Sequence, residues 1–139
     1  MKIEIVYKSR RNTRKVAEAI GRALKVKPKD ISKNTTIDEA DILFLGCGIY
    51  AGDVHNDVKT FIEKLDSHKV RNIVLFSTCG KGEDQMDKVR DKINECGLNL
   101  NDKAYCCKGR AMIFVNRANP DADDLNEAVK FAESIITNN

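Results

Sequence analysis

Hydrophobic residues along the chain gather in short segments whose composition is typical of β-strands. A strand that is buried on both faces of a parallel sheet has a nearly continuous apolar run. Such runs lie at residues 41–49 and 72–78, and further β-forming segments lie at 2–7, 30–33 and within 98–109. The pattern therefore predicts five strands, of which the second is short and weak.

Between these strands the hydrophobic positions recur at intervals of three and four residues, as they do on one face of a helix. This spacing predicts helices at residues 12–24, 56–65 and 84–96, and a last helix that opens at residues 119–121. Gly97 follows the third of these helices at the place where a C-cap glycine belongs. Strands and helices thus alternate along most of the chain.

This alternation predicts one α/β domain over residues 1–139, with a parallel sheet that carries helices on both faces. In such sheets a ligand binds at the carboxyl ends of the strands, near the point where the strand order reverses. The loops that leave these ends lie at residues 8–13, 47–56, 77–84 and 108–112. They are therefore the candidates for a functional site.

The composition is that of an ordinary globular protein, with 42% hydrophobic and 32% charged residues. No apolar run approaches the roughly 20 residues that cross a bilayer, and the first strand leaves no room for a signal peptide. We therefore expect a cytoplasmic protein with no membrane partner.

Five cysteines are an odd number, which favours free thiols. A net charge of +3, with three tyrosines and no tryptophan, does not favour nucleic acid as a partner.

The first loop, KSRRNT at residues 8–13, is strongly basic. It contains Ser9, Asn12 and Thr13, which are residue types that favour helix N-caps. The start of a helix presents N–H groups and a partial positive charge, and neighbouring guanidinium groups add charge-assisted bonds to a phosphate. The alternative is a capped helix with solvated arginines, and the residues alone leave both interpretations open.

The second and third loops are rich in glycine and small residues. Gly46 and Gly48 are expected to form a tight turn or to let the backbone approach a flat ligand. Tyr50 is the aromatic residue of these loops; it is a candidate for stacking on a ligand, and the alternative is packing against the helix at 56–65. The loop at 77–84 could present backbone groups to a heterocycle.

The cysteines and histidines form no recognisable reactive cluster. Cys106 and Cys107 are adjacent on a predicted strand, so we expect them to point to opposite faces and to be packed as free thiols. Cys79 lies in the third loop, either as a redox-active thiol or as a small residue in a tight turn. Because a helix separates His55 from His68 and no further ligands lie near them in the sequence, we expect no metal site.

Three motifs at three strand ends are those of a known family. They are Tyr7, Ser9, Asn12 and Thr13 followed by KVAEAI, then Gly48-Ile49-Tyr50-Ala51-Gly52, then Phe76 to Gly80. On these motifs the chain resembles the flavodoxin family over nearly its whole length. The resemblance implies a three-layer flavodoxin-like α/β sandwich, with a five-stranded parallel sheet in the order 2-1-3-4-5. It also implies flavin mononucleotide (FMN) as the cofactor.

The same resemblance implies a set of cofactor-binding residues and assigns no residue a catalytic role. The phosphate would lie in the first loop, and the flavin ring between the other two. The implied residues are Ser9, Arg10, Arg11, Asn12 and Thr13; Tyr50, Ala51, Gly52 and Asp53; and Thr78, Cys79, Gly80, Lys81 and Gly82.

The first loop departs from the family pattern. It is one residue shorter, and Arg11 replaces a Thr-Gly pair whose glycine can adopt a positive φ. Arg11 would adopt that geometry only at a cost of about 1 kcal/mol or more. Since Tyr50 alone is available for stacking, we expect weaker flavin binding than is usual in the family. The family is usually acidic, so a net charge of +3 favours redox partners with acidic surfaces.

The leading hypothesis from the sequence is an FMN-binding electron carrier that acts between partner proteins. One alternative is a small FMN-dependent reductase with a nicotinamide or quinone substrate. The other is a flavodoxin-like module that has lost FMN and binds an anionic ligand or partner through loop 8–15.

Overall fold

The fold is a parallel sheet covered by helices on both sides. The computed structural model describes residues 1–8, 11–48, 54–79, 85–108 and 120–138. Within these residues five strands pair in parallel in the order β2-β1-β3-β4-β5, as the family resemblance implied. The strands are β1 (Ile3–Lys8), β2 (Lys29–Asp30), β3 (Ile42–Gly48), β4 (Ile73–Cys79) and β5 (Leu100–Lys108).

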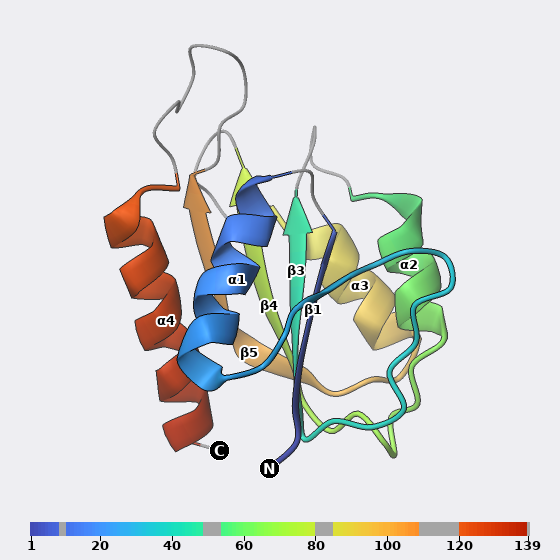
Figure 1. Cartoon of the computed structure of the whole chain (residues 1–139). Helices are drawn as coiled ribbons and strands as arrows, with labels where there is room; N and C mark the ends of the chain where they lie inside the picture. The colour runs from blue at the N-terminus through green and yellow to red at the C-terminus, as the bar shows by residue number, and fades with distance from the viewer. Residues whose placement is uncertain (9–10, 49–53, 80–84, 109–119, 139) are drawn as a thin grey trace.

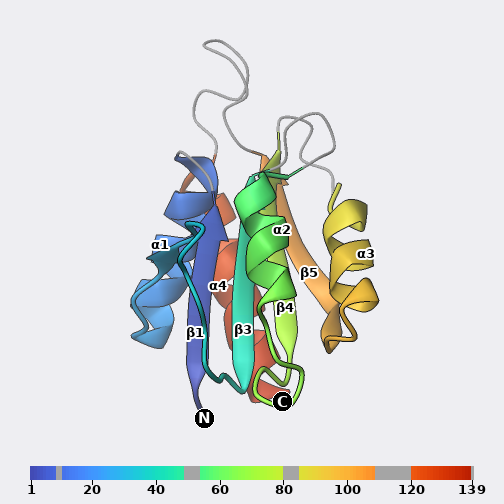
Figure 2. The same ribbon diagram turned by 90° about the vertical axis from the view of Figure 1, so that its right-hand side faces the viewer.

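The helices of the described residues lie in two layers, and the sheet separates them. They are α1 (Asn12–Leu24), α2 (Asn56–Glu63), α3 (Asp87–Glu95) and α4 (Ala122–Thr137). Helices α1 and α4 cover one face of the sheet, and α2 and α3 cover the other (Figures 1 and 2). The three-layer arrangement expected from the sequence is therefore confirmed.

Each layer has its own hydrophobic core. On one face, Val16 and Ile20 of α1 and Ala132 of α4 pack with Phe44 and Phe76 of the sheet. On the other face, α2 and α3 pack on the alternate residues of the same strands. Successive strand residues point to opposite faces, and all seven residues of β3 are buried, so both of its sides are covered. This explains the unbroken apolar run in the sequence.

Several predicted element boundaries are confirmed, and others are not. The first helix has the predicted bounds, and Gly97 has the positive φ of 69° that its C-cap position favours. The second helix was predicted to reach residue 65 but ends at Glu63. Leu65 follows in a turn, where its N–H donates to the carbonyl of Ile62, and it still packs on the core. The apolar spacing thus continues past the end of the helix.

The two adjacent cysteines of β5 point to opposite faces, as predicted. Cys106 packs against the core under α2 and α3, and Cys107 belongs to the core under α1 and α4. Neither forms a disulfide in the described part of the chain. In the part of the chain that the structure describes, no helix has both the length and the apolar content needed to span a bilayer.

Candidate functional site

The carboxyl ends of the three central strands meet at one edge of the sheet, the upper edge in Figure 1. Lys8 at the end of β1 is in register with Cys47 of β3, and Cys47 is in register with Ser77 of β4. Gly48 pairs in the same way with Thr78. The strand ends from which three of the four candidate loops start therefore lie side by side, as the topology predicted.

Two threonines from distant parts of the sequence meet beneath this edge. Thr13 lies in the first turn of α1, and Thr78 is the penultimate residue of β4. Their Oγ1 atoms are 2.8 Å apart and hydrogen-bonded, although 65 positions separate the residues in the chain. Both side chains are buried, with exposed fractions of 0% and 4%. The bond joins the first loop to the third.

Gly46 makes room for this contact. It lies on β3, and its α-carbon faces the aromatic ring of Phe76 and the methyl group of Thr13. A Cβ atom at this position would lie 2.3 Å from the ring of Phe76 and 2.9 Å from Cγ2 of Thr13. The sequence suggested that Gly46 forms a tight turn or approaches a ligand; the turn is wrong, because Gly46 lies within β3. The glycine allows α1 and β4 to pack closely over β3.

The first helix starts without the side-chain cap that the sequence suggested. The N-cap residue is Arg11, and within the described residues its side chain makes no capping hydrogen bond. Arg11 has a φ of −143°, so the left-handed geometry expected to cost about 1 kcal/mol is not adopted here. Arg11, Arg14 and Lys15 all have exposed side chains. Three cations therefore surround the N-terminus of α1, where the helix dipole is also positive.

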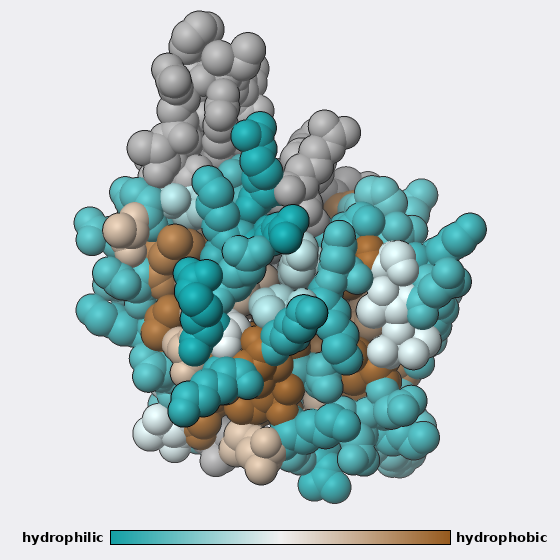
Figure 3. Space-filling view, viewed as in Figure 1, coloured by the Kyte–Doolittle hydropathy of each residue, from teal (hydrophilic) through white to brown (hydrophobic). Residues whose placement is uncertain are grey.

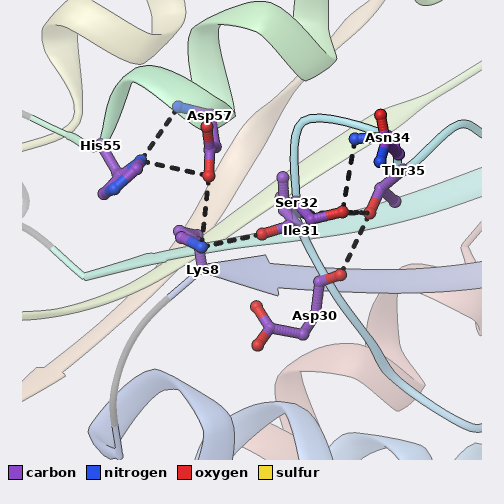
Figure 4. Close-up of polar contacts among 8 residues, drawn as sticks. All are labelled: Lys8, Asp30, Ile31, Ser32, Asn34, Thr35, His55 and Asp57. Atoms are coloured by element: carbon purple, nitrogen blue, oxygen red, sulfur yellow. Dashed lines mark hydrogen bonds and ion pairs between the residues drawn. The ribbon is translucent and has the colours of Figure 1, made fainter.

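Lys8 connects three elements at the same edge (Figure 4). Its Nζ donates to the carbonyl oxygen of Ile31 at 2.9 Å and lies 3.4 Å from Oδ2 of Asp57 in the first turn of α2. His55 is the N-cap of α2, and its Nδ1 accepts from the N–H of Asp57 at 3.0 Å. From the sequence, His55 was a candidate only for metal binding, and its role as a helix cap was not predicted. The end of β1 is thus tied to the segment after β2 and to the start of α2.

Replacing Lys8 with methionine should lower the free energy of unfolding by about 1 kcal/mol, because a half-buried hydrogen bond and an ion pair are lost together. Urea denaturation followed by circular dichroism measures the change. The matched control is Lys29→Met, since Lys29 pairs with Glu4 at 3.3 Å from a more exposed position. We expect the control to change stability by less than about 0.5 kcal/mol. Equal effects of the two substitutions would contradict the role assigned to Lys8.

Ser77 carries an unpaired buried hydroxyl group. Its Oγ is inaccessible to solvent and has no hydrogen-bond partner in the described part of the chain. Its neighbours in register are Cys47 and Cys106, one on each adjacent strand. Burial raises the pKa of the Cys47 thiol to about 12, so Cys47 is protonated at neutral pH. Ser77 therefore has a neutral thiol beside it on β3.

Replacing Ser77 with alanine should leave the unfolding free energy unchanged or raise it by up to about 1 kcal/mol. A buried polar group without a partner costs about 1–3 kcal/mol. Removing the hydroxyl avoids this cost, but the smaller side chain also loses packing contacts, which offsets part of the stabilisation. Urea denaturation of the flavin-free protein measures the change. A loss of more than about 1 kcal/mol would mean that the hydroxyl has a partner in solution.

Of the residues implied as cofactor-binding, five lie wholly or partly in the described structure. Arg11, Asn12 and Thr13 stand at the start of α1, and Thr78 and the backbone of Cys79 end β4. The side chain of Cys79 lies outside the described residues. So do the other implied residues, which are Ser9, Arg10, Tyr50, Ala51, Gly52, Asp53, Gly80, Lys81 and Gly82. The described members come together at one edge of the sheet.

Comparison with known proteins assigns the chain to a family. A family model described as a flavodoxin domain matches residues 4–118, which is most of the chain. The chain belongs to the flavodoxin family. This family membership and the flavodoxin-like fold together support a flavoprotein.

Individual proteins agree with this flavodoxin assignment. An uncharacterised protein of Methanocaldococcus jannaschii is 33% identical over 152 residues, which cover 99% of this chain and 100% of the relative. The structure of oxidised flavodoxin 2 from Bacillus cereus superposes with a TM-score of 0.73 at 18% identity and covers both chains completely. A flavodoxin from the domain Archaea has a TM-score of 0.68 at 19% identity, covering 97% of this chain and 99% of the other. The two structures show that the fold is shared.

Sequence reasoning missed several residues that organise this flavodoxin-like edge. Lys8 was read only as part of the basic loop, although a lysine directly after a strand is placed to reach neighbouring strand ends. The pairing of Thr13 with Thr78 had no sequence signal, because it depends on how closely α1 packs on the sheet. Among the described residues, no group of three or more histidine, cysteine, aspartate or glutamate side chains could hold a metal ion.

Proposed function

We propose that this member of the flavodoxin family binds FMN non-covalently at the carboxyl edge of its sheet and carries electrons between partner proteins. One observation carries the proposal: Arg11, Arg14 and Lys15 gather at the N-terminus of α1. A helix N-terminus already favours an anion through its N–H groups and its dipole. Cations placed there repel the dipole unless a negative group lies between them, and the phosphate of FMN is such a group.

The residues at this edge fit the cofactor chemically. Arginine side chains suit phosphate oxygens because they donate two parallel hydrogen bonds. In this proposal Arg11 supplies contacts that a glycine-containing loop would make with backbone N–H groups. Its ordinary φ means that it does so without the strain of a left-handed residue. Ser9, Arg10 and Asn12 would complete the phosphate site, and Thr13, whose side chain is buried against Thr78, would support it through its backbone.

The buried threonine pair positions the two parts of the proposed site. Because Thr13 and Thr78 are hydrogen-bonded, the start of α1 is held at a fixed distance from the end of β4. The first proposed ring-binding segment, residues 50–53, follows β3, and the second, residues 78–82, begins with the last two residues of β4. Lys8 and Asp57 hold the start of α2, which follows the first of these segments.

The bound flavin would supply the redox chemistry, and the protein would supply binding, orientation and the electrostatic environment. No side chain of the proposed site needs to act as an acid or a base. A carrier differs from a reductase in that a reductase must also bind its own reducing substrate. The carrier role can be tested separately from flavin binding.

The test is reduction of the FMN-loaded protein under anaerobic conditions. Dithionite should bleach the flavin absorbance, and NADH or NADPH alone should leave it unchanged over minutes. Rapid bleaching by a nicotinamide would contradict the carrier role and favour a small FMN-dependent reductase. Loss of all flavin absorbance after gel filtration would contradict FMN binding itself.

A further inference from the structure

The exposed face of α1 is mainly basic and is called the basic stripe here. It comprises Arg11, Arg14, Lys15, Arg22 and Lys25, with Glu18 as its one acidic member. Residues at these spacings lie on one side of a helix. Over 13 residues the helix is about 20 Å long, so the stripe runs from the proposed phosphate site to the opposite end of the layer. Hydrophilic side chains cover this part of the face in Figure 3.

Most of this charge is not neutralised within the protein. Arg14 forms an ion pair with Glu18 at 2.8 Å. Arg11, Lys15, Arg22 and Lys25 make no ion pair with any residue in the described part of the chain. Four cations on α1 and its two caps therefore face solvent without an ion-pair partner among the described residues.

The neighbouring helix has the opposite charge. Helix α4 lies beside α1 on the same face of the sheet (Figure 1) and is mainly acidic. Its acidic residues, counted with its N-cap, are Asp121, Asp123, Asp124, Glu127 and Glu133, and its single basic residue is Lys130. An acidic partner would be attracted to α1 and repelled by α4. The pair of helices therefore fixes one side of the protein for docking and disfavours the other.

A hollow lies at the far end of the stripe, next to its basic side chains. It has a volume of about 290 Å³ and lies where the chain leaves α1. Arg22, Lys25 and Lys27 surround it, and Val26 and Pro28 line it with apolar surface. Glu18 also lines it, so a carboxylate side chain that entered this hollow would meet three cations and one carboxylate. Such a surface fits a folded protein with an acidic patch better than it fits a flat membrane.

We propose that the face of α1 from Arg11 to Lys27 docks an acidic protein, the redox partner of this chain. This inference rests on the proposed electron-carrier function for the identity of the partner. The docking geometry itself does not depend on flavin. The stripe begins at the proposed phosphate site, so a partner bound along it would lie next to the carboxyl edge of the sheet.

The test is an amide-shift titration of the full ¹⁵N-labelled chain, with and without added FMN, against an acidic and a basic c-type cytochrome. At about 20 mM salt the acidic cytochrome should shift the amides of residues 11–27, and raising the salt to about 500 mM should weaken its binding at least tenfold. Arg22→Glu/Lys25→Glu should abolish the binding. The matched variant Lys69→Glu/Arg71→Glu has the same net charge and should retain it.

Three results would overturn the docking proposal. They are preferential binding of the basic cytochrome, shifts that lie away from α1, and tighter binding of a single-stranded oligonucleotide than of the acidic cytochrome. Binding of the acidic cytochrome at α1 by a chain that takes up no FMN would uphold the docking surface and contradict the electron-carrier function. The two proposals therefore fail separately.

Discussion

Replacing Gly46 with alanine should destabilise the protein by about 2–3 kcal/mol, because the added methyl group overfills a packed core. The new Cβ would lie 2.3 Å from the ring of Phe76 and 2.9 Å from the methyl group of Thr13. Phe76 is fully buried and cannot swing into solvent. The strain can be relieved only if α1 moves away from the sheet or the ring changes its rotamer.

Because Thr13 belongs to the first turn of α1, this movement would also disturb the proposed phosphate site. We expect Gly46→Ala to weaken FMN binding by at least about tenfold, which corresponds to about 1.4 kcal/mol. Urea denaturation measures the first effect, and quenching of FMN fluorescence measures the second.

Gly21→Ala is the matched control for this substitution. A Cβ atom at Gly21 would lie 2.5 Å from the carbonyl oxygen of Val26 and 2.9 Å from Pro28, so this substitution should also destabilise the fold. Gly21 stands near the other end of α1, far from Thr13. We expect the control to lose stability and to keep its affinity for FMN. Equal losses of affinity in both variants would show that stability alone accounts for the effect at Gly46.

Replacing Thr13 with valine should lower the unfolding free energy by about 1–3 kcal/mol, because the Thr78 hydroxyl is left buried without this hydrogen bond. Valine has nearly the shape of threonine, so packing is largely preserved. The two oxygens are 2.8 Å apart, an ordinary length for such a bond, and both groups are inaccessible or almost inaccessible to solvent. Water therefore cannot readily replace the lost partner.

A double-mutant cycle separates this bond from the other contacts of the two residues. If the hydroxyl groups stabilise each other, Thr13→Val/Thr78→Val should cost less than the sum of the two single substitutions, by about 0.5–3 kcal/mol. Thr13→Ser should recover most of the stability, since it restores the hydroxyl. Strict additivity in the cycle would contradict a direct bond between the two side chains.

The sequence was sufficient for the architecture because each layer of the fold leaves a periodic signal. The run at β3 is apolar throughout because both of its faces are covered, and α1 has its predicted bounds because its buried residues recur every three or four positions. Short elements were less well predicted. The strand expected at 30–33 consists of Lys29–Asp30, since its pairing depends on β1 more than on its own composition.

The candidate site was predictable in position but not in its contacts. Motif spacing placed Thr13 and Thr78 at the same edge, and the sheet topology brings them there. Their direct hydrogen bond depends on the close approach of α1 at Gly46, which no local pattern reveals. The ion pair of Lys8 with Asp57 is likewise a contact between elements. The φ of Arg11 could not be inferred from a family pattern that has a glycine and one more residue in the loop.

The most direct test of the account is a fluorescence titration of FMN with the flavin-free protein, repeated with riboflavin, which lacks the phosphate. We expect saturable one-to-one quenching of FMN at micromolar concentrations. Riboflavin should bind at least about tenfold more weakly, a difference of about 1.4 kcal/mol that reports the phosphate contacts at the start of α1. Absence of saturable binding at micromolar FMN would contradict the account. Equal affinities for FMN and riboflavin would contradict the phosphate site.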